Sequence, residues 1–108
     1  MADTPGEFEQ LVLLAILQLG SEAYAASLRD RISEDADRKV TRGAVYATLD
    51  RLTTKGLVEW AVEDSTPERG GIPRRRFSVT PDGVDAVRRS YSALRTLADG
   101  LEDVLGEA

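Results

Sequence analysis

The first helical segment of the chain is apolar on most of its faces. Thr4-Pro5-Gly6-Glu7 predicts a capped start, with Thr4 as the N-cap and Glu7 closing a capping box, and the helix extends to about Leu19. Because such a helix must be covered on more than one side, a partner subunit is an expected source of cover in a chain this short. A second helix is predicted from Tyr24 to about Glu34.

A third helix is predicted by a clear amphipathic pattern. Thr41 is its expected N-cap, and Lys55-Gly56 supplies a basic last turn followed by a glycine cap. Its inward face carries Val45, Leu49 and Leu52. At about 100° per residue, the residues on the opposite face and its flank are Gly43, Ala47, Asp50 and Thr54, with Arg42 and Tyr46.

From Leu57 the apolar period changes to two, which predicts a hairpin. The first strand would place Val58, Trp60 and Val62 on one face and Glu59 and Glu63 on the other. A loop containing Pro67, Gly70, Gly71 and Pro73 follows. The second strand would place Arg75, Phe77 and Val79 on one face, and Arg74, Arg76 and Ser78 on the other.

A last helix begins at Thr80-Pro81, a capping threonine followed by proline. Its apolar residues are spaced alternately three and four apart, which is the heptad pattern of a coiled-coil seam. Such a seam needs a partner, so we expect a second copy of the chain; folding back onto its own domain is the alternative. The unbroken seam consists of Val84, Val87, Tyr91, Leu94, Ala98, Leu101 and Leu105.

The charge of the chain is unevenly distributed. The formal net charge is −5, yet residues 38–76 hold nine Lys and Arg against five acids, so basic charge is local. The chain has no histidine and no cysteine, and its acids scatter along predicted solvent faces, so we expect no catalytic residue, no metal site, no cofactor and no enzyme activity. The apolar run 11–17 is too short to span a membrane, and a cytoplasmic protein is expected.

Several features of the basic segment allow two interpretations. The arginine triplet 74–76 would contact DNA or form a solvated strand edge, and its place beside the third helix favours DNA. Gly70-Gly71 lacks the setting of a phosphate loop, so a turn is expected. Asp50 would accept from a cytosine amino group or, as we favour, pair with an arginine of the hairpin. Trp60 and Tyr24 are expected in the core rather than in a ligand pocket.

The order of the elements is that of a winged helix-turn-helix domain with a carboxy-terminal dimerisation helix. The expected class is α+β, mainly α, with residues 1–80 as the DNA-binding domain and 81–108 as the dimerisation helix. In this fold the third helix enters the major groove, and the tip of the hairpin reaches the flanking backbone or the minor groove. The predicted DNA contacts are Lys39, Thr41, Arg42, Gly43, Tyr46, Ala47, Arg69, Gly70, Gly71, Arg74, Arg75 and Arg76.

Four stretches, "GEFEQLVLLAILQL", "GAVYATLDRLTTKGLV", "TPERGG" and "RRFSVTPDG", give the chain a resemblance to the PadR-like family of winged-helix regulators. The resemblance covers about residues 6–90. It implies a homodimeric, cytoplasmic, bacterial-type repressor that binds a palindromic operator and is released by a small molecule. Tyr46 matches the family's recognition-helix tyrosine, and Arg69-Gly70-Gly71 match its wing tip. Some small members line a pore with a tryptophan on the last helix, which is missing here, so the resemblance does not extend to that pocket.

The leading hypothesis is a ligand-responsive repressor whose two-fold dimer binds an inverted repeat in double-stranded DNA. A winged-helix module that holds an acidic protein partner on its basic hairpin is the alternative. The effector remains unidentified, and no membrane partner is expected. By resemblance and by pattern, the first and last helices form the dimer interface, through Phe8, Leu11, Val12, Val84, Val87, Tyr91, Leu94, Ala98, Leu101 and Leu105.

Overall fold

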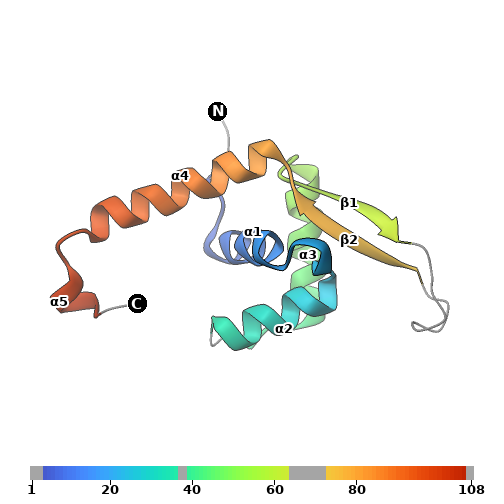
Figure 1. Ribbon diagram of the computed structural model, residues 1–108, viewed down its shortest axis with the longest axis horizontal. Coiled ribbons are helices and arrows are strands. Elements are labelled where there is room, and N and C mark those ends of the chain that lie inside the picture. The colour runs from blue at the N-terminus through green and yellow to red at the C-terminus, as the bar shows by residue number, and fades with distance from the viewer. Residues whose placement is uncertain (1–3, 37–38, 64–72, 107–108) are drawn as a thin grey trace.

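The computed structural model describes residues 4–36, 39–63 and 73–106. Three helices are followed by an antiparallel hairpin and a long closing helix, which confirms the expected mainly helical class (Figure 1). The elements are α1 (Glu7–Leu19), η1 (Gly20–Glu22), α2 (Ala25–Asp35), α3 (Arg42–Thr54), β1 (Val58–Glu63), β2 (Arg74–Val79), α4 (Pro81–Ala98) and α5 (Glu102–Leu105).

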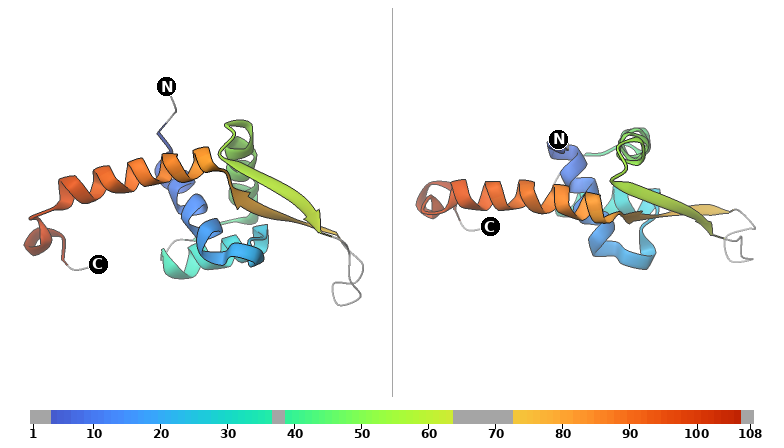
Figure 2. Two further views of the ribbon diagram at one scale, coloured as in Figure 1. Left: turned by 45° about the horizontal axis from the view of Figure 1, so that its top comes forward. Right: turned by 90° about the horizontal axis from the view of Figure 1, so that it is seen from above.

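Helix α1 lies in the middle of the fold, in contact with α2, α3, α4 and β2 (Figure 2). Val12 and Leu13 are fully buried there, together with Leu28 of α2. The chain itself therefore provides much of the cover that an all-round apolar helix requires. Leu14 and Leu17 of α1 are 44% and 46% exposed, and they leave a partly apolar surface open on one side.

The start of α1 differs from the sequence prediction. The helix begins at Glu7 with Gly6 as its N-cap, so the expected Thr4 cap is wrong. The Gly6 N–H donates to Oε1 of Glu9 at 2.9 Å. Lys55, the C-cap residue of α3, holds the same carboxylate, and this tertiary ion pair favours a start two residues later than the local pattern suggests.

The two other threonine caps are confirmed. Oγ1 of Thr41 accepts the Ala44 N–H at 3.1 Å and begins α3. Oγ1 of Thr80 accepts the Gly83 N–H at 3.1 Å and begins α4, with proline at the first helical position. Each hydroxyl satisfies a backbone donor that the first turn of a helix leaves without a partner.

The hairpin has the predicted alternation, with Val58 opposite Val79 and Glu63 opposite Arg74. Its base is buried through Val58 and Phe77. The expected core position of Trp60 is wrong, since that residue is 41% exposed. The hairpin projects past the helices (Figure 1), so only its base is covered on both sides. The burial expected of Tyr24 is confirmed by its exposure of 7%, although this residue also lines a cleft.

A tight junction ties the start of α4 to the end of α3. The Thr80 N–H donates to the Leu57 carbonyl at 3.0 Å, and the Thr80 hydroxyl donates to the Gly56 carbonyl at 2.7 Å. A Cβ at Gly83 would lie 2.1 Å from the Leu57 oxygen, so this contact requires a glycine. The direction in which α4 leaves the domain is thereby fixed relative to α3.

The last helix is shorter than the heptad pattern predicts. Helix α4 ends at Ala98, and Gly100 has a φ of 85°, a left-handed conformation that terminates helices. The expectation of one unbroken seam is wrong, because Leu101 and Leu105 lie beyond this break. Val87 is buried against the domain, whereas the distal half of α4 extends away from it (Figure 2).

Glu9 links α1 to the last turn of α3. Its side chain is 9% exposed and lies 3.0 Å from Nζ of Lys55 and 3.7 Å from Nε of Arg51. Burial alone would raise the pKa of Glu9, but the Gly6 N–H, Lys55 and Arg51 together hold that pKa below its ordinary value. The folded state therefore stabilises the ionised carboxylate.

Glu9→Ala should lower the free energy of unfolding by about 2–3 kcal/mol at pH 7, because it leaves Lys55 and the Gly6 N–H without their acceptor. A group whose pKa is lowered on folding contributes stability above its ordinary pKa of 4.5 and loses it as the pH falls through the folded value. Denaturant unfolding at pH 7 and pH 3 should therefore show a smaller difference from the parent at pH 3. Glu34→Ala, an exposed change on α2, is the control. A difference independent of pH would contradict the role of the ion pair.

Candidate nucleic-acid interface

The outer face of α3 has the composition that the sequence predicts. Val45 and Leu49 are buried, while Gly43, Ala47 and Tyr46 are exposed. The small residues allow another molecule to approach the helix closely, and Tyr46 adds a hydroxyl that donates and accepts hydrogen bonds. This face therefore combines close access with a few polar groups.

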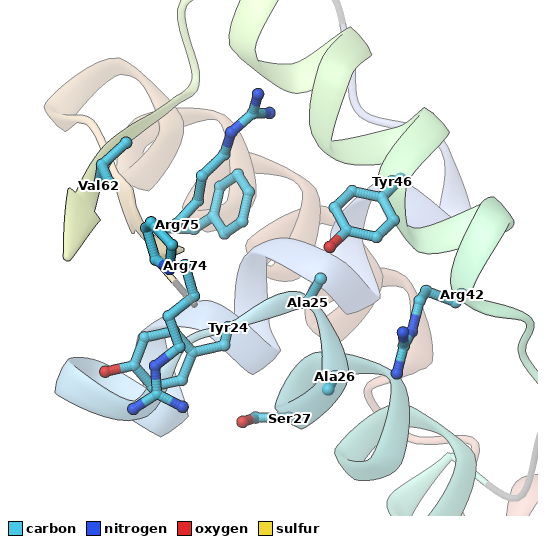
Figure 3. A pocket seen from close by; sticks show the side chains of 11 residues that line it. Tyr24, Ala25, Ala26, Ser27, Arg42, Tyr46, Val62, Arg74 and Arg75 are labelled. Carbon is cyan, nitrogen blue, oxygen red and sulfur yellow. The ribbon is translucent and has the colours of Figure 1, made fainter. Parts of the chain in front are cut away.

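A cleft of about 610 Å³ lies between α3, the hairpin and the start of α2 (Figure 3). Arg42 and Tyr46 approach it from α3, and Arg74 and Arg75 approach it from β2. The structure thus brings together four of the residues predicted to contact DNA, from two segments about 30 positions apart in the sequence. The full lining is Tyr24, Ala25, Ala26, Ser27, Arg42, Tyr46, Val62, Pro73, Arg74, Arg75 and Phe77.

The start of α2 is a part of this cleft that the sequence analysis missed. Tyr24 is its N-cap residue and makes no side-chain capping hydrogen bond. Ala25, Ala26 and Ser27 follow and line the cleft. The first turn of a helix carries partial positive charge from its backbone N–H groups, which favours anions. The missing cap could have been noticed in the sequence, since Tyr24 stands where Ser, Thr, Asp or Asn is usual.

Arg74 is held at the edge of the cleft by an aromatic ring and a carboxylate. Its guanidinium carbon lies 3.5 Å from the centroid of the Tyr24 ring, and Nη2 lies 4.0 Å from Oε1 of Glu63. The Tyr24 hydroxyl donates to Oε2 of Glu63 at 2.5 Å. This hydrogen bond to a carboxylate, with burial, raises the pKa of Tyr24.

The arginine triplet is divided between two faces of the hairpin. Arg75 lines the cleft, and its guanidinium carbon lies 4.2 Å from the centroid of the Trp60 ring. Arg76 instead lines a separate hollow of about 470 Å³ beside Leu17 and η1. The alternation of the strand places Arg74 and Arg76 on one face and Arg75 on the other, as the sequence predicts, and the DNA contact expected of Arg76 stays a prediction.

The remaining residues that were predicted to contact DNA lie in different places. Lys39 and Thr41 are exposed just before α3. The wing tip 69–71 lies outside the described residues. Asp50 is exposed, and among the described residues it forms no ion pair with the triplet, whose guanidiniums lie beside Glu63 or over aromatic rings. The pairing favoured for Asp50 is thus not formed with β2.

Metal sites and membrane-spanning helices are both absent from the described ranges. No group of three or more residues that could hold a metal ion occurs among the residues whose structure is described. In that same part of the chain, no helix is both long and apolar enough to span a membrane.

A model of the transcriptional regulator PadR-like family matches residues 13–89, which include α3, the hairpin and every residue that lines the cleft. The chain belongs to the PadR-like family. Its members are transcription regulators rather than enzymes, and the family supports a DNA-binding role for this chain. No curated protein matches this PadR-like chain significantly.

Solved structures of PadR-like proteins share the fold. A PadR-like transcription factor from Bacteroides fragilis is 25% identical, with 93% of this chain and 91% of the other covered at a TM-score of 0.71. A PadR family regulator from Clostridium difficile is 20% identical, with 94% and 100% covered at a TM-score of 0.73. A third, from Eggerthella lenta, is 25% identical, with 94% and 88% covered at a TM-score of 0.67. These matches confirm the winged-helix prediction.

Arg75→Ala should shift the fluorescence emission of this PadR-like protein to longer wavelength. Trp60 is the single tryptophan of the chain, and removing the guanidinium from its face exposes the ring to water. Arg74→Ala is the matched control, because that guanidinium lies over Tyr24 instead. Identical emission spectra of the two variants would contradict the Arg75–Trp60 contact.

Proposed function

We propose that this PadR-like regulator is a sequence-specific repressor that binds a palindromic operator as a homodimer and is released by a small-molecule effector. The supporting observation is the cleft that joins Arg42 and Tyr46 of α3 to Arg74 and Arg75 of the hairpin. It places cationic groups on both sides of an uncapped helix start, although the chain as a whole carries a net charge of −5. Operator binding implies a cytoplasmic location, which is part of the same proposal.

The cleft suits a phosphate group of the DNA backbone. Arginine donates paired hydrogen bonds to phosphate, and the backbone N–H groups at the start of α2 add donors on the remaining side. Such contacts fix the position of a protein on the duplex without reading its sequence. We therefore assign affinity and register to the cleft, with Lys39 and the wing tip 69–71 as further expected backbone contacts.

The outer face of α3 is then the surface that reads bases. With a phosphate held beside Arg42, the exposed face lies toward the major groove. Gly43 and Ala47 allow close approach, while Thr41 and Tyr46 supply hydroxyl groups. The Thr41 oxygen already accepts the Ala44 N–H, so its own O–H remains available as a donor. Sequence discrimination would rest on this small number of polar groups.

Arg42→Ala, Arg74→Ala and Arg75→Ala should each weaken binding to operator and random duplexes alike. Each change removes about one phosphate contact, so the slope of log K against log salt should become shallower by about one. Fluorescence anisotropy of labelled duplexes between about 50 and 200 mM salt measures both quantities.

Arg88→Ala is the control, since that arginine lies on α4 and pairs with Asp85 at 3.1 Å. Salt slopes equal to that control would remove the cleft from the DNA surface. If the parent protein shows no salt-sensitive affinity for any duplex, the DNA-binding proposal fails and an acidic protein partner for the basic hairpin replaces it.

The homodimer proposal rests on an apolar face of α4 that the described residues leave exposed. Tyr91, Leu94 and Leu97 are 52%, 59% and 78% exposed. Three neighbouring large apolar side chains on an extended helix are typical of an interface. A second copy would bury them by antiparallel or crossed packing, together with Leu14 and Leu17 of α1. The proposed interface differs from the predicted one in two ways. Leu97, which the predicted seam did not include, is added, and Val12 and Val87 are left out because they are already buried.

The double change Leu94→Arg and Leu97→Arg should convert the dimer to a monomer, because two charges would have to be buried without partners. Sedimentation velocity measures the mass of the particle. Thr96→Arg is the control, because Thr96 lies on the opposite side of the same helix and is also exposed. A dimer that persists in the double variant would refute this interface.

The release of DNA by an effector would use the junction between α4 and α3. Since Thr80 and Gly83 fix α4 against Leu57, a change in the angle between two α4 helices moves each α3 with it. A ligand can shift this equilibrium only by its differential affinity for the two spacings. About 34 Å, one helical turn, is the spacing that binding to successive major grooves requires.

A further inference from the structure

Glu63 is a carboxylate built into the middle of the cationic strand region. It ends β1 directly opposite Arg74. Its Oε1 lies 4.0 Å from Nη2 of Arg74, and its Oε2 lies 4.0 Å from Nε of Arg76. One acid therefore pairs with two of the three arginines of β2, Arg74 at the cleft and Arg76 at the neighbouring hollow.

The position of Glu63 does not depend on the arginines. The Tyr24 hydroxyl donates to it at 2.5 Å, and Tyr24 is 7% exposed. A buried donor of this kind holds the carboxylate in place even if the guanidiniums turn away. Tyr24 also carries Arg74 on its ring, so acid and arginine share one support.

The two ion pairs are long enough to be exchanged. Charge-assisted hydrogen bonds of guanidinium to an anion have N···O distances of about 2.7–2.9 Å, whereas both distances to Glu63 are 4.0 Å. A phosphate oxygen entering the cleft can offer Arg74 the shorter, paired geometry. The free protein thus holds its arginine near an acceptor that is weaker than the one DNA supplies.

We propose that Glu63 is an internal competitor of the DNA phosphate, which holds Arg74 and Arg76 in the free protein and lowers the affinity for duplex DNA without contacting it. This inference rests on the proposed DNA-binding function and concerns how strongly the same site binds. On binding, Arg74 passes from Glu63 to a phosphate oxygen, while the carboxylate stays on Tyr24. Its fixed negative charge then lies close to the bound backbone and weakens the complex.

Glu63→Gln tests the charge with little change of shape. The amide oxygen can still accept the Tyr24 hydroxyl, so the support of Arg74 is retained. Affinity for a random duplex of about 25 base pairs should increase about three- to tenfold at about 0.1 M salt, and the increase should shrink at higher salt as screening grows. Anisotropy titrations over a salt series measure both effects.

Glu59→Gln is the matched control. Glu59 lies on the same strand and the same face as Glu63, and it is opposite Ser78 rather than an arginine. The substitution Glu59→Gln therefore removes the same charge as Glu63→Gln. Its affinity should stay within about twofold of the parent, since exposed charges farther from the cleft are screened. The gain from Glu63→Gln should also be lost in a protein that carries Arg74→Ala and Arg76→Ala, because no held guanidinium is then released.

Two results would overturn the proposal. If Glu63→Gln binds no better than Glu59→Gln, the carboxylate does not compete with phosphate. If it binds more weakly, Glu63 orders Arg74 for binding instead of withholding it. Glu63→Ala provides a second variant with the same expected direction should the first unfold, which thermal melting reveals. If the parent protein shows no salt-sensitive affinity for duplexes, the DNA-binding proposal itself fails, and this outcome is separate from the two above.

Discussion

The cleft exists because β2 is anchored at Phe77. This side chain is 3% exposed in the core, and its backbone N–H donates to the Ala23 carbonyl at 2.9 Å. The hydrogen bond places the segment before α2 along β2, so the uncapped first turn of α2 lies beside Arg74 and Arg75. Without that contact, nothing would hold the hairpin arginines and the start of α2 on the same surface. The geometry of the proposed phosphate site therefore rests on one buried anchor and its backbone partner.

The charges of this region are balanced locally rather than summed over the chain. The overall charge of −5 would repel DNA, but the cleft concentrates arginine on both of its walls. Within it, Tyr24 supports one guanidinium on its ring and one carboxylate on its hydroxyl. Aromatic rings also hold Arg75, through Trp60. Arg74 and Arg75 are thus held in defined positions by stacking on aromatic rings, which reduces the freedom that they would lose on meeting a phosphate.

The domain and the last helix form a mechanical unit. Glu9 joins α1 to the end of α3, and the junction at Leu57, Thr80 and Gly83 joins the end of α3 to α4. Whatever covers the apolar face of α4 and the exposed leucines of α1 therefore also sets the position of α3. This connection gives a physical basis for the proposed control of DNA binding from the far end of the molecule.

The order of helices and strands, the inward face of α3 and the caps at Thr41 and Thr80 were readable from the sequence, because each depends on residues within a few positions of one another. The start of α1, the exposure of Trp60 and the break after Ala98 were predicted wrongly. The start of α1 depends on a residue distant in the sequence, because Lys55 pairs with Glu9. The exposure of Trp60 depends on the helices, which do not extend far enough to cover that part of the hairpin. The break had a local signal in Gly100, which the heptad pattern masked. The sequence also indicated that Arg42, Tyr46, Arg74 and Arg75 act together. Only the tertiary structure decided that they line one cleft, that the start of α2 forms its third wall and that Arg76 lies outside it. The reason is that these segments are distant in the sequence and are brought together by packing at Phe77.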